Sequence, residues 1–315
     1  MPLPVPITLW HWTGFILVIL LFLALDLGFF HRSNRADTSR QAVLWSVGWF
    51  FLAVLFARGL RVWRGPEESL EFLTAYFVEF SLSMDNVAAI ALIFTFFAVP
   101  ARYQHRLLFQ GIFGALVLRG VMIGLGVTLI HAFQWTLYLL GAFLIFTGLK
   151  WGCSKQPSVR PENNLVLRLA RRILPVSSDY DGDKLLTRVG GRRALTPLAL
   201  VLLMVETADL IFAVDSIPAV LAVTQKPFIV FTSNVFAILG LRSLYFAVAG
   251  AIRYFRFLKT GVAGVLIFVG VKMLASPWVN MPTALSLAVV AAMIALSIGF
   301  SIWYSWQIGG KEKGN

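Results

Sequence analysis

Long runs of apolar residues, separated by short polar segments, follow one another along most of the chain. A helix that crosses a bilayer needs about 20 consecutive, mainly apolar residues. Nine runs come near this length, which predicts an all-α polytopic membrane protein. We expect about nine transmembrane helices, over 10–30, 42–60, 72–97, 107–130, 132–149, 195–222, 228–250, 261–274 and 282–304.

The basic residues are spread unevenly over the connections between these runs. If the N-terminus lies outside, the connections and the tail on the inner side hold 20 of the 27 Lys and Arg residues. Connections rich in Lys and Arg stay in the cytoplasm. We therefore expect an outside N-terminus and a cytoplasmic C-terminus. This distribution explains the net charge of +12 without nucleic acid, which we do not expect as a partner.

The composition narrows the classes of function. Hydrophobic residues make up 58% of the chain and charged residues 13%, against about 45–50% and about 25% in soluble domains. A single cysteine, Cys153, excludes an internal disulfide and a cysteine metal cluster. The chain also lacks a nucleophile–base set, a nucleotide loop and a zinc motif, so we do not expect an enzyme or a bound cofactor.

The one long connection, roughly 150–194, shows three local patterns. Its basic part, "RPENNLVLRLARRILP", predicts an amphipathic helix on the membrane surface that anionic lipid would attract. Two strand-like runs on either side of Gly190-Gly191 predict a β-hairpin. The acidic "DYDGD" (179–183) is expected to be a solvated turn, because it lacks the spacing and the closing Glu of a calcium loop.

Three pairs of segments indicate an internal repeat. "EFSLSMDNVAAI" (79–90) aligns with "DLIFAVDSIPAV" (209–220), and "GALVLRGVMI" (114–123) aligns with "AILGLRSLYF" (237–246). "GAFLIFTGLK" (141–150) aligns with "AGVLIFVGVK" (263–272) in the same order. Each half holds three helices, an odd number, so the second copy enters the membrane from the opposite side. Inverted repeats of this kind are typical of secondary transporters, whose sites lie near the midplane.

The repeat divides the chain into five parts. We expect two N-terminal helices over 1–71, a first three-helix repeat over 72–150 and a basic cytoplasmic loop over 151–194. A second, inverted repeat follows over 195–274. The last helix and a cytoplasmic tail occupy 275–315.

Buried charge points to the function. Each buried charge costs at least about 2.5–3.5 kcal/mol on insertion scales, yet the first helices of the two repeats carry five carboxylates: Glu79, Asp85, Glu206, Asp209 and Asp215. Arg119 and Arg242, aligned in the second helices, can balance two of them. They are either structural ion pairs or groups that exchange with a cation. The remaining carboxylates need protons or a cation.

The oxygen donors on these helices suit a hard divalent cation. Carboxylate, amide and hydroxyl oxygens are ligands for Mg²⁺, Ca²⁺ and Mn²⁺. Pro218 also leaves the carbonyl of Val214 without its helical donor. The predicted metal ligands are Glu79, Asp85, Asn86, Glu206, Asp209, Asp215 and Ser216.

Other residues are further candidates for the site or are expected outside it. Further candidates are Ser83, Asp26 near the inner end of the first helix, and Met84, which we expect mainly to fill space. Three acids before the third helix, Glu67, Glu68 and Glu71, are expected to form a solvated rim.

The chain resembles the TerC integral membrane family, and most closely its Alx-type bacterial members. The segments that carry the resemblance are "EFSLSMDNVAAI", "VETADLIFAVDSIPAVLAVTQKPFIVFTSNVFAILGLRSLYF" and "LALDLGFFHR". The likeness covers most of the chain. It implies a manganese exporter of the bacterial inner membrane, related to LysE-like exporters and linked to tellurite resistance. By motif, the family's acids correspond to Glu79, Asp85, Glu206, Asp209 and Asp215.

Three functions stay open at this point. The first is export of a divalent cation, most of all Mn²⁺, coupled to protons that recharge the emptied carboxylates. The second is a membrane scaffold that binds metal or docks partner proteins through the 150–194 loop in metal or tellurite resistance. The third is export of a small organic cation, which needs an apolar pocket for the rest of the substrate.

Overall fold

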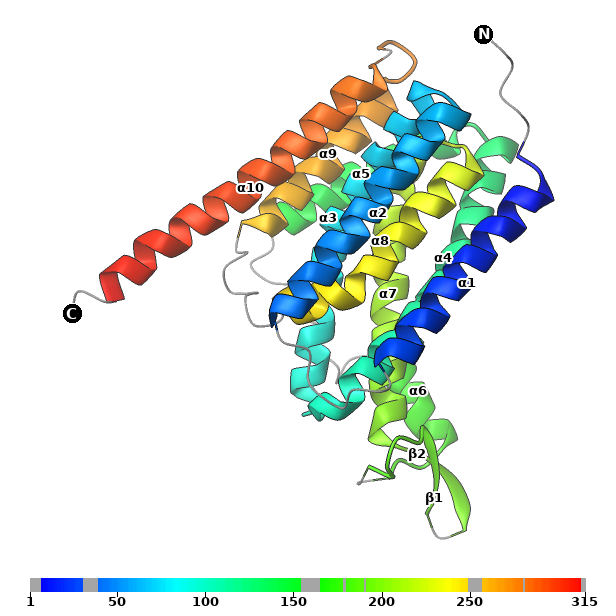
Figure 1. Ribbon diagram of the computed structural model, residues 1–315, viewed down its shortest axis with the longest axis vertical. Coiled ribbons are helices and arrows are strands. Elements are labelled where there is room, and N and C mark those ends of the chain that lie inside the picture. The colour runs from blue at the N-terminus through cyan, green and yellow to red at the C-terminus, as the bar shows by residue number, and fades with distance from the viewer. Residues whose placement is uncertain are drawn as a thin grey trace.

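The computed structural model describes residues 7–30, 39–153, 165–177, 180–189, 191–248, 257–279 and 281–312. Within these residues the chain is a helical bundle with one β-hairpin at an end (Figure 1). Its elements are α1 (Leu9–Phe30), α2 (Ser39–Trp63), α3 (Pro66–Phe96), α4 (Ala101–Ala132), α5 (Thr136–Cys153), α6 (Leu165–Ile173), β1 (Leu186–Val189), β2 (Arg192–Leu195), α7 (Pro197–Leu221), α8 (Pro227–Val248), α9 (Leu258–Ala275) and α10 (Thr283–Glu312).

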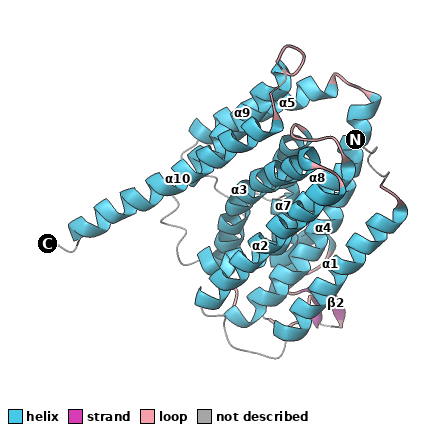
Figure 2. Cartoon of the chain, turned by 45° about the horizontal axis from the view of Figure 1, so that its top comes forward, coloured by secondary structure: helices cyan, strands magenta, loops and turns pink. Residues whose placement is uncertain are grey.

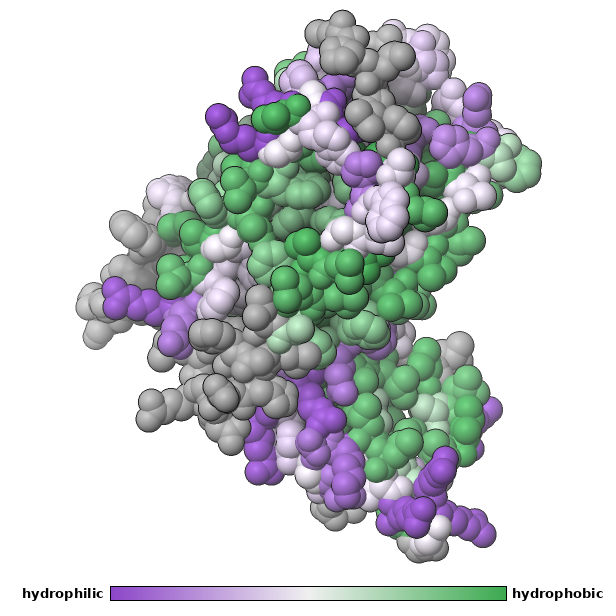
Figure 3. Space-filling model, turned by 45° about the vertical axis from the view of Figure 1, so that its right-hand side comes forward, coloured by the Kyte–Doolittle hydropathy of each residue, from purple (hydrophilic) through white to green (hydrophobic). Residues whose placement is uncertain are grey.

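The predicted all-α membrane fold is confirmed. Eight helices of the described residues are long and apolar enough to cross a membrane, and α1 adds a shorter apolar stretch over Leu9–Ala24. Figure 3 shows hydrophobic side chains over the middle of one face, with hydrophilic ones gathered toward its upper end and its lower tip. α3 begins at Pro66 rather than 72, because its polar first turns follow a proline that starts the helix after Gly65 (φ 103°).

The first helices of the two proposed repeats run in opposite directions. The Tyr180 hydroxyl, on the segment before α7, donates to the Phe97 carbonyl, just after α3, at 3.0 Å. At the other end, the Thr224 hydroxyl, just after α7, donates to Glu71 Oε2, near the start of α3, at 2.9 Å. α3 therefore ends where α7 begins, as an inverted repeat requires. We call these the hairpin end and the far end.

The halves also pack on each other reciprocally. α3 packs on α8, and α4 packs on α7, so each first helix meets the second helix of the other half. Figure 2 shows α3, α7, α8 and α4 as the centre of the bundle, with α1 and α10 at its edges. The division of the chain into repeats stays a prediction, and this cross-packing is the arrangement that the prediction requires.

Small residues let α5 and α9 approach closely. A Cβ built on Gly148 would lie 2.8 Å from the carbonyl oxygen of Ala263. A Cβ on Gly270 would lie 2.7 Å from the carbonyl oxygen of Gly141. The sequence repeat aligns Gly148 with Gly270 and Gly141 with Ala263, so the two contacts exchange under the repeat. Small residues at such crossings are typical of packed membrane helices.

The long connection forms the elements expected of it, as far as it is described. α6 is the predicted amphipathic helix, and β1 and β2 pair antiparallel through Val189 and Arg192. Gly190, Asp179 and residues 154–164 lie outside the described residues. The Thr187 hydroxyl donates to Asp181 Oδ2 at 2.8 Å, which holds the pKa of that carboxyl below its usual range. The acidic segment is thus a turn at the solvent-exposed tip.

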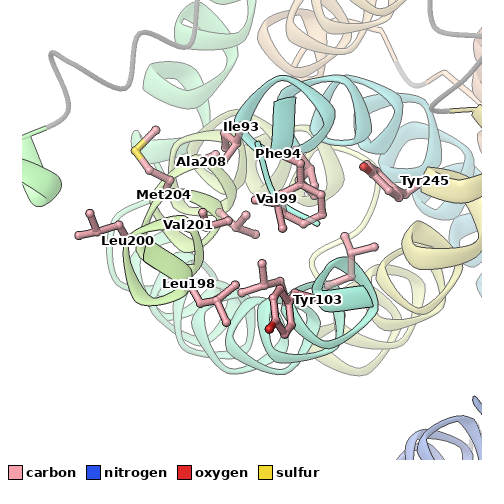
Figure 4. Close-up of a cluster of buried hydrophobic side chains, with 14 of the residues drawn as sticks. Ile93, Phe94, Val99, Tyr103, Leu198, Leu200, Val201, Met204, Ala208 and Tyr245 are labelled. Carbon is pink, nitrogen blue, oxygen red and sulfur yellow. The ribbon is translucent and has the colours of Figure 1, made fainter. Parts of the chain in front are cut away.

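A hydrophobic cluster joins this connection to the transmembrane helices. Figure 4 shows Phe94 and Val99 of the α3–α4 corner facing Val201 of α7, and Ile93 and Met204 belong to the same cluster. Leu167 of α6 and Leu195 of β2 are buried in the same cluster. The hairpin end is therefore packed against the start of α7 rather than attached by a free linker.

Candidate ion-binding site

Arg119 joins the two halves of the protein in the centre of the bundle. Its guanidinium pairs with Glu79 of α3, and its Nη2 donates to Asp209 Oδ1 of α7 at 3.2 Å. Its Nη1 also donates to Asn234 Oδ1 of α8 at 2.9 Å. Arg119 is 2% exposed and Glu79 is fully buried. One arginine of α4 therefore connects acids from the two aligned segments.

Buried oxygens around this junction lack hydrogen-bond partners. Among the described residues, both aligned segments carry buried side-chain oxygens that have no hydrogen-bond partner. They are Glu79 Oε2, Ser83 Oγ, Asp85 Oδ2 and Asn86 Oδ1 of α3, and Asp209 Oδ2 and Ser216 Oγ of α7. A buried acceptor without a partner costs about 1–3 kcal/mol. Such groups are rarely retained in this number unless they bind something.

A small cavity separates two of these donors. It has a volume of about 20 Å³, and Asn86 of α3 and Asp209 of α7 are its polar lining residues. Its other walls are apolar, with Ile112 of α4 and Phe212 of α7 among them. About 10–15 Å³ is enough for one water molecule. The cavity therefore has room for a single small species between the two halves.

The other predicted acids occupy separate positions around this centre. Glu206 lies against α4, where a Cβ on Gly114 would collide with its carboxylate. Asp215 accepts a hydrogen bond from Thr147 of α5 and lies in the field of Lys150. Asp85 faces the charge of Lys259 on α9. Three of the five carboxylates, Glu79, Asp209 and Glu206, thus lie beside α4, whereas Asp215 lies beside α5 and Asp85 is nearest in charge to α9.

The carboxylates do not converge on a single point in this conformation. Among the described residues, no three His, Cys, Asp or Glu side chains are close enough to hold a metal ion together. Arg119 takes the place that a cation would occupy between Glu79 and Asp209. An ion could bind both carboxylates only after the guanidinium had moved.

Similarity to known proteins identifies the family. The sequence model of the family described as "Integral membrane protein TerC family" matches residues 64–308. The chain belongs to the TerC family. It is 47% identical over 291 residues to an uncharacterized membrane protein of Myxococcus xanthus, covering 92% of this chain and 91% of the relative. It is 41% identical over 308 residues to Alx of Escherichia coli strain K12, named as a candidate membrane-bound redox modulator, covering 94% and 95%. No protein of known structure matches.

The remaining predicted residues of this TerC protein have other surroundings. Arg242, the counterpart of Arg119, contacts Nδ1 of His105 at 3.2 Å. Met84 packs into two hydrophobic clusters, as expected of a side chain that fills space. Asp26 belongs to α1, but its side chain lies outside the described part of the chain.

Sequence reasoning missed Asn234, Thr147 and His105. A signal for Asn234 was present, because "TSN" (232–234) places three polar residues inside an apolar run. Thr232, Ser233 and Asn234 lie in α8 and are each at most 1% exposed. No comparable signal marked Thr147, since a lone threonine in a membrane helix usually donates to its own backbone.

The predicted solvated rim was wrong for two of its three acids. Glu68 and Glu71 are 5% and 8% exposed. Arg64 donates to both oxygens of Glu68 at 2.8 and 3.0 Å, and Lys226 Nζ lies 3.1 Å from Glu71 Oε2 and 3.5 Å from Glu68 Oε1. With Thr224, these four residues tie the start of α3 to the α7–α8 turn. We call this set of five the far-end clamp.

Replacing Arg119 by Ala should strongly destabilise the protein, because it leaves Glu79 and Asp209 buried without a counter-charge. Breaking a buried ion pair costs about 3–5 kcal/mol. The double variant Arg119→Ala/Glu79→Gln should recover part of this loss, since it removes one of the uncompensated charges. Thermal unfolding of the purified protein in detergent measures both effects.

Arg58→Ala is the matched control, because Arg58 is exposed on α2. It should leave the unfolding temperature near that of the wild type. Equal unfolding temperatures for Arg119→Ala and Arg58→Ala would contradict the central role of this arginine.

Proposed function

We propose that this protein exports divalent metal cations, foremost Mn²⁺, from the cytoplasm across the inner membrane. The observation that carries the proposal is the small cavity between Asn86 and Asp209, one oxygen donor from each half. Further unpartnered carboxylate and hydroxyl oxygens lie on the same two helices. This is the arrangement expected of a transporter site at the interface of inverted repeats.

The donor chemistry and the volume support a small inorganic ion. Carboxylate, amide and hydroxyl oxygens suit Mn²⁺, Mg²⁺ and Ca²⁺ better than Zn²⁺ or Cu⁺, which favour sulfur and imidazole. A cavity of about 20 Å³ has no room for the carbon skeleton of an organic cation. Mn²⁺ is the preferred ion because the TerC resemblance implies manganese.

Arg119 gives the empty carrier a counter-charge. With Glu79 and Asp209 it forms a group of net charge −1, which is far cheaper to bury than two free carboxylates. An arriving divalent cation competes with the guanidinium for the same oxygens. The carboxylates that Arg119 does not reach are Asp85, Glu206 and Asp215, and these are the groups that protons would neutralise when the ion leaves.

The two ends of the bundle supply a gate each. By the charge distribution of the sequence, the hairpin end is cytoplasmic and the far end is outside. The start of α3 holds the turn after α7 through the far-end clamp. The segment before α7 holds the start of α4 through the Arg106–Asp183 ion pair, and the turn after α3 through the Tyr180–Phe97 hydrogen bond. The clamp, whose acids are buried, would keep the outer end shut, while the exposed Arg106–Asp183 contact at the inner end exchanges more freely.

The name of the Alx relatives supports a second candidate, a change in the redox state of the cell. One exposed cysteine, Cys153, cannot form a disulfide within the chain. A redox effect would then follow indirectly from the ions that the protein moves, or would need a partner protein.

Cells that express the Asp209→Asn variant should hold as much manganese under Mn²⁺ load as cells without the gene, because the amide removes a charge that binds the ion. The wild type should lower cell manganese. Elemental mass spectrometry of washed cells measures the total.

Glu67→Gln is the matched control, since Glu67 is an exposed acid on α3 outside the site. It should export like the wild type at equal membrane expression. Normal export by Asp209→Asn would overturn the site, whereas unchanged manganese with the wild type itself would favour the scaffold.

Replacing Lys226 by Met should open the outer end, because Glu68 and Glu71 lose a shared counter-charge. A Val220→Cys probe reports this in a Cys153→Ser background, since Val220 is fully buried one turn before Thr224. A membrane-impermeant maleimide added to whole cells should label Val220→Cys slowly, and markedly faster once Lys226→Met is added.

Val62→Cys, at an 87% exposed position at the same end of α2, is the control for labelling from outside. Its labelling should not depend on Lys226. Equal labelling of Val220→Cys with and without Lys226→Met would show that the clamp does not close the outer end.

A further inference from the structure

α1 stands away from the rest of the bundle and touches it mainly through aromatic side chains. Figures 1 and 2 show it along one side of the molecule. The ring of Phe15 lies 5.8 Å from those of Phe56 on α2 and Phe228 on α8. The ring of Phe22 lies 5.8 Å from Trp49 on α2. These contacts hold the helix in place but leave space between the backbones.

A long groove occupies part of this space. Its volume is about 550 Å³, within the range of about 300–1,000 Å³ of ligand pockets. α1, α2 and α8 line it, with Gly14, Val18, Ile19, Leu55, Phe56 and Phe236 among its walls. Its one titratable lining residue is His11. Nothing in this lining would recognise a polar ligand along the length of the groove.

We propose that this groove binds an acyl chain of a membrane phospholipid. The groove lies between two apolar helices at membrane depth, and Val18 and Leu55 at its edge are 48% and 54% exposed. In a bilayer this opening faces hydrocarbon. Interiors next to hydrocarbon do not keep voids of this size, because unfilled walls lose their dispersion contacts. A flexible, unbranched chain is the occupant that fits a long apolar groove without hydrogen-bonding groups.

The polar end of the groove indicates how the lipid is oriented. His11 stacks on Trp63 at 4.7 Å between ring centroids, and its Nδ1 lies 2.9 Å from the Thr8 hydroxyl. The guanidinium of Arg64 lies 5.5 Å from the Trp63 ring. Aromatic side chains of this kind mark the level of the lipid headgroups. The headgroup is therefore placed at the far end, where Trp63 lines the groove and also contacts the clamp residue Arg64.

Gly14 keeps the groove wide and offers a way to fill it. A Cβ built on Gly14 meets no atom within 4 Å. A side chain can therefore start from this position toward the groove, and leucine is a good helix former. Gly124 on α4 has equally open surroundings and does not line the groove. Gly14→Leu and Gly124→Leu are therefore a matched pair, the same substitution in two transmembrane helices.

The test is photo-crosslinking of the full-length protein, reconstituted in liposomes that contain phosphatidylglycerol with a diazirine near the end of one acyl chain. After illumination and digestion, mass spectrometry locates the adducts. We expect adducts concentrated on the groove residues of α1 and α2, several-fold above those on lipid-facing α10. They should fall to the level of α10 in Gly14→Leu and stay unchanged in Gly124→Leu.

Even labelling of all lipid-facing helices, or equal labelling of the two leucine variants, would overturn the proposal. Leu55→Trp, which narrows the groove from α2, serves as a second variant if Gly14→Leu unfolds. Excess unlabelled phosphatidylglycerol should compete for the groove adducts. Competition by a free isoprenoid alcohol but not by the phospholipid would assign the groove to a different hydrophobic ligand and would also contradict the proposal.

Discussion

The burial of opposite charges at the centre of the bundle is the interaction on which this architecture depends. Glu79 and Asp209 come from helices that enter the membrane from opposite sides, and each would be prohibitively costly to bury alone. Arg119 satisfies both at once and reaches Asn234 as well. Four helices are thereby fixed around one guanidinium, and the oxygens that it leaves unpartnered become available to a small ion.

The rest of the bundle keeps this centre both closed and able to change. Tight crossing of α5 and α9 through glycines gives a rigid flank, whereas the two ends rely on contacts of different strength. The acids of the far-end clamp are buried although Lys226 is 41% exposed, whereas both partners of the Arg106–Asp183 contact at the hairpin end are exposed. Exposed ion pairs contribute at most about 1 kcal/mol. The inverted relation of the halves thus places related contacts at opposite ends, with unequal stability.

Much of this could be predicted from the sequence, and the rest could not for identifiable reasons. The apolar runs predicted the helices, and the aligned acids and arginines predicted that Arg119 would meet carboxylates. The burial of Glu71 was missed because a polar helix start resembles a solvated loop until its partner is known. That partner, Lys226, lies 155 residues further along the chain. The position of the Glu206 carboxylate against Gly114 likewise depends on how α7 packs on α4, which no local pattern encodes.

The most direct test is Mn²⁺ flux through the purified protein in liposomes that enclose a fluorophore quenched by Mn²⁺. The wild type and the exposed-acid variant Glu67→Gln should quench the fluorophore when Mn²⁺ is added outside. Glu79→Gln and Asp209→Asn should be as slow as liposomes without protein. Flux at the wild-type rate in either site variant, or no flux above the protein-free rate in any of them, would contradict ion transport through the carboxylates that Arg119 joins.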